Sequence, residues 1–257
     1  MILTVNVSNT SVLLGAYEKG RQTFCASLHT NLSKTSDEYA VQMQSVLALY
    51  GRTPADISGV IFSCVVPSLL SCIRRALTHL YSGRIYTVGP GLKTGLSIRM
   101  DDPSQLGSEL VCCAVEVLAA YSYPCVIISF DTATTMIALD EKGAMRGGTI
   151  LPGVRTGMDA LSTRTAQLPQ IDLVAPKCGV LGTNSTACMQ AGAILGTASM
   201  LDGMLERFAD SLQCHDLFCV ATGEIAPVIL RHCNHPIHYH ENLVLDGLYR
   251  LYCKNAK

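Results

Sequence analysis

Two short turns of small polar residues are the first groups in this chain that could do chemistry. They are Ser8-Asn9-Thr10-Ser11 and Thr132-Ala133-Thr134-Thr135, and each follows a short apolar run. Hydroxyl and backbone N–H groups without bulky side chains are what phosphate oxygens require. Such turns are also ordinary hairpin chemistry, because Ser and Asn hydrogen-bond their own backbone. A single turn is weak support for a ligand site, whereas two in matching positions are stronger.

The elements around the two turns follow one plan. Apolar runs from Ile2 to Val7 and from Val12 to Tyr17 predict a hairpin around the first turn. Runs from Val126 to Phe130 and from Met136 to Leu139 predict another around the second turn. We expect a third strand after each hairpin. The two hairpins are about 120 residues apart, close to half of the chain, so the pattern indicates a duplication.

The duplication predicts two lobes, residues 1–120 and 121–257, that face each other across a cleft. Strands that alternate with helices indicate an α/β fold. Apolar periodicity and capping residues predict the remaining elements. These are helices over 36–50, 68–81, 107–120, 185–212 (one helix or a pair) and 242–252, and buried strands over 56–67 and 217–221.

The composition limits the classes of function. Of the 257 residues, 49% are hydrophobic and 15% charged, and the net charge is -1. These values exclude intrinsic disorder and a basic surface for nucleic acid or acidic membranes. The mean hydropathy is +0.30, but no window reaches the roughly 18 uninterrupted apolar residues of a membrane span. Twelve cysteines without an export signal predict a soluble protein of a reducing compartment, the cytoplasm.

A histidine-rich segment near the C-terminus is a separate candidate site. It contains His232, Cys233, His235, His238 and His240. This set could bind zinc. The spacing matches no closed structural zinc site, however, so we predict histidines of a surface loop that precedes the last helix.

Eight segments, taken in order along the chain, are more specific than either turn. They are Asn6-Val-Ser-Asn-Thr-Ser, Ser36-Asp-Glu-Tyr, Ser63-Cys-Val-Val-Pro, Val88-Gly-Pro-Gly-Leu-Lys-Thr-Gly-Leu, Thr132-Ala-Thr-Thr, Gly147-Gly-Thr-Ile-Leu-Pro-Gly, Thr165-Ala-Gln-Leu-Pro and Ala221-Thr-Gly. Together they resemble the type III pantothenate kinases, from Ile2 to about Leu251, essentially the whole chain. The resemblance implies an α/β actin-like ATPase fold, a ribonuclease H-like duplicated fold shared with acetate and sugar kinases and Hsp70.

The resemblance also implies an activity and its partners. Members of the family transfer the γ-phosphoryl group of ATP to pantothenate, the first step of coenzyme A biosynthesis. They use Mg²⁺ together with a monovalent cation, K⁺ or NH₄⁺, and they are homodimers. We therefore expect ATP and pantothenate as ligands, and neither nucleic acid nor a membrane as a partner.

The family motifs imply where the site residues lie. Glu109 stands at the position of the catalytic base. ATP would lie against Asn6, Val7, Ser8, Asn9, Thr10, Ser11, Val12, Leu13 and Thr132. Pantothenate would lie near Met100, Gly107, Ser108, Glu109, Leu110 and Ser185. The monovalent cation would lie at Ser129 and Asp131.

Three positions that are charged in the family pattern are neutral in this chain. Asn6 and Ser129 replace aspartates, and Leu110 replaces an arginine. An amide can ligate Mg²⁺ through its oxygen but brings no charge, and a leucine cannot replace a bidentate guanidinium. Asp131 restores one negative charge near Ser129. Two alternatives follow: a pseudokinase-like binding or regulatory protein that keeps the fold and the dimer, and a kinase for another small hydroxyl substrate.

Overall fold

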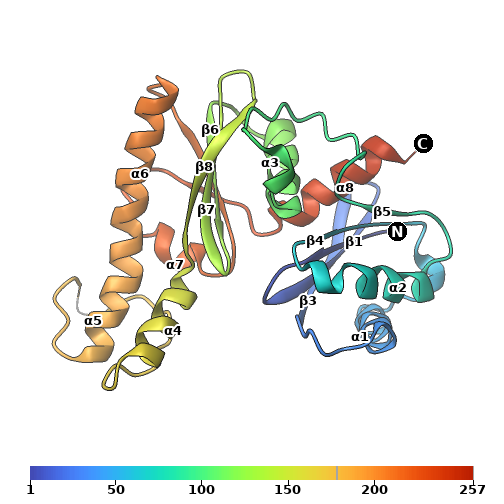
Figure 1. Ribbon diagram of the computed structural model, residues 1–257, viewed down its shortest axis with the longest axis horizontal. Coiled ribbons are helices and arrows are strands. Elements are labelled where there is room, and N and C mark those ends of the chain that lie inside the picture. Colours follow the sequence, from blue (N-terminus) through green and yellow to red (C-terminus); the bar gives the residue numbers. More distant parts are fainter. Residues whose placement is uncertain (178, 257) are drawn as a thin grey trace. The chain divides into compact units, whose positions relative to one another are not determined.

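The computed structural model describes residues 1–177 and 179–256. The chain divides into two compact units, drawn in Figure 1. The first contains Met1–Leu96, Ser104–Ala119 and the segment from Asn242 onward, and the second contains Ser97–Pro103 and Ala120–Glu241. Besides Ala120, the units differ from the predicted lobes in two segments, since the C-terminal helix joins the first unit and residues 97–103 join the second.

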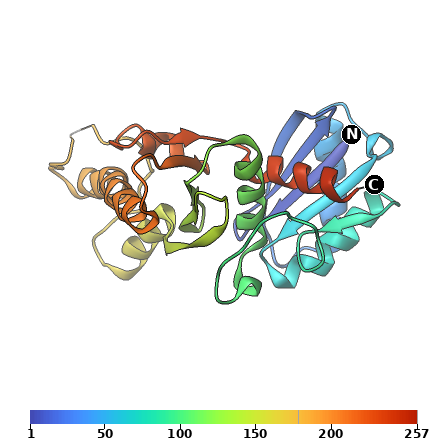
Figure 2. The ribbon, with the colours of Figure 1, turned by 90° about the horizontal axis from the view of Figure 1, so that it is seen from above.

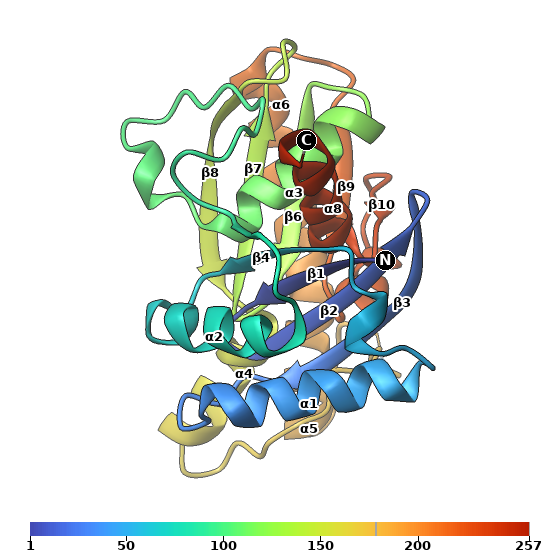
Figure 3. The same ribbon diagram turned by 90° about the vertical axis from the view of Figure 1, so that its right-hand side faces the viewer.

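The first unit is built on a five-stranded mixed sheet in the order β3-β2-β1-β4-β5. Two antiparallel neighbours lie on one side of the central strand, and two parallel ones lie on the other. The strands are β1 (Ile2–Val7), β2 (Ser11–Glu18), β3 (Arg21–His29), β4 (Gly59–Cys64) and β5 (Ile85–Thr87). Figure 3 shows α1 (Ser36–Leu49) and α2 (Leu70–Leu80) against one face. Alternate residues of β1, namely Leu3, Val5 and Val7, are fully buried in this layer.

Local chemistry sets the ends of these elements. A capping box between Thr35 and Glu38 starts α1: the Thr35 N–H donates to Glu38 Oε2 at 2.7 Å, and the Glu38 N–H donates to Thr35 Oγ1 at 3.3 Å. The predicted strand over 56–67 is shorter in the structure. Turns of 3₁₀ helix at Pro54–Asp56 and Pro67–Leu69 flank β4. Each begins with a proline, which lacks the N–H that a sheet needs.

The C-terminal helix α8 (Leu243–Asn255) covers the other face of the first sheet, as Figure 2 shows. The Tyr17 ring stacks on Tyr249 with centroids 4.6 Å apart, and the Tyr17 hydroxyl donates to Asp246 Oδ1 at 2.6 Å. Helix α8 also crosses α3 (Ser108–Ala120) in backbone contact. A Cβ at Gly247 would lie 1.9 Å from the carbonyl oxygen of Cys112. These contacts explain why the last helix belongs to the first unit.

The second unit repeats the same topology with the order β10-β9-β6-β7-β8. Its central strand again has two antiparallel neighbours on one side and two parallel ones on the other. The strands are β6 (Cys125–Phe130), β7 (Ala133–Leu139), β8 (Met145–Pro152), β9 (Phe218–Thr222) and β10 (His238–Tyr239). The predicted duplication and α/β class are thereby confirmed.

Four helices complete the second unit. They are α4 (Val154–Arg164), α5 (Ser185–Ala191), α6 (Thr197–Leu212) and α7 (Ala226–Leu230). The predicted helix over 185–212 is a pair, because a π-helical turn, Gly192–Gly196, separates α5 from α6. Leu201 and Leu205 of α6 are buried against the strands that α6 runs beside in Figure 1.

Part of the histidine-rich segment is a strand, and not the loop predicted, because β10 pairs with β9. His235 Nδ1 lies 3.2 Å from Asp202 Oδ1, and His240 Nδ1 lies 2.8 Å from the Tyr121 hydroxyl. Over residues 1–177 and 179–256, no three His, Cys, Asp or Glu side chains are grouped to hold a metal ion. In the same part of the chain, no helix combines the length and apolar character of a membrane span.

Candidate functional site

Asn6 and Ser63 lie side by side near the carboxyl ends of β1 and β4. They are register partners and both are fully buried. The Ser63 hydroxyl donates to Asn6 Oδ1 at 2.6 Å, a length that fits an O–H donor better than an N–H donor. Asn6 Nδ2 is buried and has no hydrogen-bond partner in the described part of the chain. A buried donor without an acceptor costs about 1–3 kcal/mol, so this N–H group is a candidate to contact a ligand oxygen.

The first polar turn is held from inside by Ser8. The Ser8 N–H donates to the Ser11 carbonyl at 2.8 Å, and Ser8 Oγ accepts from the Ser11 N–H at 3.2 Å and the Thr10 N–H at 3.4 Å. The Thr30 hydroxyl donates to the Ser8 carbonyl at 2.9 Å. Ser8 is itself buried, whereas Asn9 and Thr10 are exposed at the tip. The turn is therefore a fixed scaffold whose exposed tip is open to a ligand.

The residues that flank this turn differ in what they can offer. The side chains of Val7 and Val12 are fully buried in the core of the first unit. Only their backbone could take part in ligand contacts. Leu13 is half-buried on the opposite face of β2.

The start of α3 lies next to the ends of these strands. A Cβ at Gly107 would come within 3.9 Å of the Val65 side chain, and the Val65 N–H donates to the Val7 carbonyl at 3.0 Å. The Leu110 N–H closes the first helical turn by donating to the Gly107 carbonyl at 3.0 Å. Ser108 Oγ is buried and lacks a partner within the described residues. The segment predicted to hold substrate thus adjoins the end of β4.

Cys112 lies near both Glu109, the predicted base, and Ser63, the hydrogen-bond partner of Asn6. Burial raises the pKa of the Cys112 thiol far above its ordinary value, the Glu109 carboxylate raises it further, and a hydrogen bond with Ser63 opposes the rise. Burial and the Glu109 charge likewise raise the pKa of Cys113. Both thiols stay protonated, so neither acts as a nucleophile. Since Ser63 contacts both Cys112 and Asn6, the first unit places Glu109 close to the end of β1 that leads into the Ser8–Ser11 turn.

The second unit has a corresponding group of hydroxyls at the end of β6. Ser129 has Thr135 and Thr222 as register partners on its two sides. Direct cross-strand neighbours project from the same face of a sheet. Thr135 Oγ1 is buried without a partner among the residues described, and Thr222 Oγ1 donates to the Glu241 carbonyl at 3.1 Å. The hydroxyls of Ser129, Thr135 and Thr222 are therefore cross-strand neighbours on one face of the sheet.

The second polar turn is tied to the start of α4. The Thr132 carbonyl accepts from the Gly153 N–H at 2.9 Å and from the Thr156 hydroxyl at 2.8 Å. A Cβ at Gly153 would lie 2.2 Å from the Asp131 carbonyl oxygen, so only glycine fits at this position. Thr132 Oγ1 is buried and makes no hydrogen bond to the described residues. Asp131 and Thr132 thus stand beside the N-terminus of α4, where backbone N–H groups are free to bind anions.

Met100 does not join the Ser129 group inside the second unit. The segment before Met100 is bound to the start of β8, because the Met145 N–H donates to Ser97 and the Arg99 N–H donates to Met145, both at 2.8 Å. The Asp131 turn lies at the other end of that strand. Ser185 is the exposed first residue of α5.

Four residues of these groups were not predicted as site residues. Ser63, Cys112, Thr135 and Thr222 enter through cross-strand register or helix packing, which a single segment does not reveal. Thr222 could have been predicted from the sequence, because Thr222-Gly223 follows a buried strand as a small polar turn. There, a Cβ at Gly223 would lie 2.2 Å from the Phe130 carbonyl oxygen.

Two α/β units of equal topology, each with polar turns at the ends of its central strands, form the fold that is found in actin-like ATPases and sugar kinases. The (R)-2-hydroxyglutaryl-CoA dehydratase component A of Acidaminococcus fermentans superposes with a TM-score of 0.52 and 13% identity, covering 100% of this chain and 99% of that one. The inorganic polyphosphate/ATP-glucomannokinase of Arthrobacter sp. strain KM gives 0.50 and 12%, covering 98% of each chain.

The sequence comparisons are more specific. The family model described as type III pantothenate kinase matches residues 2–207. A type III pantothenate kinase of Shouchella clausii (strain KSM-K16) is 35% identical over 256 residues, which are 99% of this chain and 100% of the relative. The chain belongs to the type III pantothenate kinase family, as its motifs predict.

Proposed function

We propose that this protein transfers the γ-phosphoryl group of ATP to pantothenate and so forms 4′-phosphopantothenate, the first step of coenzyme A biosynthesis. Membership of the kinase family supports the reaction class. The observation that carries the proposal is the position of Glu109. It stands in the first turn of α3, beside the strand ends that bear Asn6 and the turn Ser8–Ser11.

Phosphoryl transfer needs positioning, charge stabilisation and a base for the attacking hydroxyl. Glu109 takes the proton of the pantothenate hydroxyl. Its carboxylate lies in the first turn of α3, where the helix dipole favours a negative charge. The exposed tip of the Ser8–Ser11 turn and the Thr132 hydroxyl contact ATP phosphates.

Asn6 offers the Mg²⁺ that accompanies ATP a weaker ligand than a carboxylate would. Its Oδ1 already accepts the Ser63 hydroxyl, and the atom left without a partner among the described residues is Nδ2, an N–H donor that cannot bind a cation. We therefore propose that Asn6 donates directly to a phosphate oxygen. Because Mg²⁺ in phosphoryl-transfer sites keeps several waters and uses substrate phosphates as ligands, its binding does not require this position.

The hydroxyl groups of Ser129, Thr135 and Thr222 suit a monovalent cation better than Asn6 suits Mg²⁺. Ser129, Thr135 and the neighbouring Asp131 carboxylate offer the oxygen ligands that hard cations prefer. The unpartnered Thr135 hydroxyl supports this assignment. We propose that Ser129 and Asp131 hold K⁺ or NH₄⁺, whose charge would offset that of the phosphates.

Pantothenate lies against Gly107, Ser108 and Leu110, with Met100 and Ser185 as further contacts. Leu110 brings an apolar side chain in place of a guanidinium, so substrate binding relies on backbone and hydroxyl groups near Ser108. The buried, unpartnered Ser108 hydroxyl supports that role.

We also propose a cytoplasmic homodimer. Ile150, Val180 and Leu181 are 76%, 74% and 80% exposed, and such side chains offer apolar surface to a second copy. Cys112 and Cys113 are packed in the core as small apolar groups, which suits a reducing compartment. Sedimentation velocity of the purified protein tests the dimer.

The kinase proposal is tested with purified protein, Mg²⁺-ATP, pantothenate and either K⁺ or NH₄⁺, by following ADP release and 4′-phosphopantothenate. Glu109→Gln should lower kcat by about 10²–10⁴-fold, the contribution of a general base, without changing Tm. Glu141→Gln is the matched control, because Glu141 is exposed in a turn of the second unit, and it should leave kcat unchanged.

Each other outcome has a separate meaning. Turnover that survives Glu109→Gln would remove Glu109 as the base. Nucleotide binding without turnover would favour the pseudokinase-like alternative. Turnover with another small hydroxyl compound, but not with pantothenate, would favour the kinase for a different substrate.

A further inference from the structure

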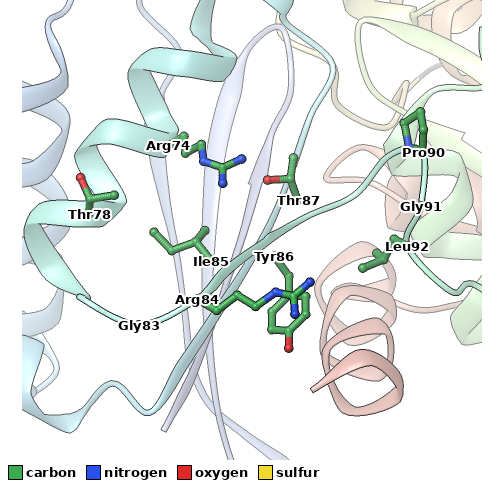
Figure 4. Close-up of a pocket in the computed structure, with 10 residues that line it drawn as sticks. All are labelled: Arg74, Thr78, Gly83, Arg84, Ile85, Tyr86, Thr87, Pro90, Gly91 and Leu92. Carbon is green, nitrogen blue, oxygen red and sulfur yellow. The ribbon is translucent and has the colours of Figure 1, made fainter. Parts of the chain in front are cut away.

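A pocket of about 470 Å³ opens along the free edge of the first sheet (Figure 4). Residues from α2, from β5 and from the turn after β5 line it. None of these residues belongs to the kinase site proposed above. Strand β5 is the outermost strand of its sheet, so one side of its backbone is not covered by another strand.

Two arginines bring positive charge to this pocket. Arg74 comes from α2, and Arg84 immediately precedes β5. No salt bridge joins either guanidinium to a carboxylate within residues 1–177 and 179–256. The Arg84 guanidinium lies 4.8 Å from the centroid of the Tyr86 ring, and this cation–π contact holds it over the pocket. Figure 4 shows Arg84 above Tyr86 and Arg74 extended toward Thr87.

Neutral donors accompany the two charges. Thr87 Oγ1 is buried and has no hydrogen-bond partner in the described part of the chain. The Val88 N–H donates to the Phe62 carbonyl of β4 at 2.9 Å. In a parallel pair, N–H groups point alternately toward and away from the neighbouring strand. Those of Ile85 and Thr87 therefore face the free edge, where a ligand could pair with them.

We propose that this pocket binds a small phosphate-bearing anion at a site distinct from the kinase site. Guanidinium groups match phosphate oxygens with paired hydrogen bonds, and Arg74, Arg84 and Thr87 supply donors from three directions. Metabolite pockets have volumes of about 300–1,000 Å³, so this one accommodates such a molecule. The Tyr86 ring adds an apolar wall for the part of the ligand that carries the phosphate.

The probe is pyrophosphate, titrated into the full-length protein while the arginine Nε–Hε signals are followed by NMR. The Nε signals of Arg74 and Arg84 should shift, and that of Arg75 should not. Isothermal calorimetry should show that Arg74→Gln and Arg84→Gln each weaken this binding by about tenfold, the loss expected for a charge-assisted contact. Arg75→Gln is the matched control, because Arg75 is exposed on α2 and lies outside the pocket lining.

Thr87→Val separates ligand binding from folding. Because it removes a buried hydroxyl that has no partner among the described residues, it should keep or raise the Tm of the free protein while weakening the binding of pyrophosphate. Unshifted Arg74 and Arg84 signals, or equal losses in the Arg75→Gln control, would overturn the proposal. Citrate tests the class of anion: binding as tight as that of pyrophosphate would overturn the phosphate assignment, whereas weaker binding supports it.

Discussion

Replacement of Gly247 by alanine tests how α8 positions α3, the helix that carries Glu109. The added Cβ would lie 1.9 Å from the Cys112 carbonyl oxygen, and ordinary contact begins at 3.4 Å, so α3 must move by about 1.5 Å. Overpacking of this kind costs about 1–3 kcal/mol, and backbone atoms cannot rotate away. Alanine is also a better helix former than glycine, which offsets about 1 kcal/mol of that cost. Because the contact is with backbone atoms, we take the upper end of the overpacking cost; the net loss is then about 2 kcal/mol, and Tm should fall by about 4–8 °C.

The same substitution should lower activity without touching a ligand. Cys112 stands one turn after Glu109 on α3, so a shift of α3 carries the carboxylate with it. Misplacement of a reacting group by about 1 Å can cost about a hundredfold in rate. We expect kcat for pantothenate phosphorylation to fall by about that factor. Thermal unfolding and steady-state kinetics on the same preparation measure both effects.

Gly203→Ala is the control, because it makes the same change in α6, where nothing lies within 4 Å of the added Cβ. It should stabilise the protein by about 0.5–1 kcal/mol and leave kcat unchanged. If Gly247→Ala raised Tm as well, the close contact between α8 and α3 would be refuted. If it lowered Tm but left kcat intact, the link between the place of α3 and catalysis would fail.

Three further substitutions probe buried polar groups. Burial raises the pKa of Asp202, but two backbone N–H groups and the His235 ring outweigh it and hold that pKa below its usual value. The ionised Asp202 carboxylate therefore stabilises the fold above the unfolded pKa of about 3.9, and this contribution is lost at lower pH. Urea unfolding should show that Asp202→Asn lowers the free energy of unfolding by about 1–3 kcal/mol at pH 7. The difference from the unsubstituted protein should vanish in acid. Arg250→Met leaves the Glu116 carboxylate, 6% exposed, without its partner; calorimetry should show a loss of about 3 kcal/mol, partly recovered by adding Glu116→Leu. Thr134→Val removes a buried hydroxyl that has no partner within the described residues, and denaturant unfolding of the free protein should show a gain of about 1 kcal/mol.

Much of the fold was predictable because its determinants are local. The apolar run from Ile2 to Val7 is a strand with those bounds in the structure, since a chain of β-branched and aliphatic residues needs burial on both faces. The segment 185–212 was predicted as one helix or a pair, and the turn Gly192–Gly196 makes it a pair. Gly203, by contrast, lies inside a continuous α6. Packing on the sheet outweighs the roughly 1 kcal/mol that a helical glycine costs.

The candidate site, too, contains residues that the local sequence predicts and contacts that only the tertiary structure reveals. The polar turns and the segment from Gly107 to Leu110 could be located from residue types and motif order. The partners of Asn6 could not, because Ser63 is 57 residues away and meets it only through the register of β1 and β4. That contact occupies Asn6 Oδ1 with the Ser63 hydroxyl and leaves Nδ2 without a partner among the described residues, which the sequence could not show.

Sequence alone determined the duplication, the α/β class and the family, since hydrophobic period, turn residues and motif order are properties of neighbouring residues. The tertiary structure decided where the last helix belongs and which atoms of the site are free. The aromatic contact of Tyr17 with Tyr249 and the backbone contact of Gly247 with Cys112 place α8 in the first unit. Such contacts join residues more than a hundred positions apart, and their energies depend on packing that no local pattern specifies.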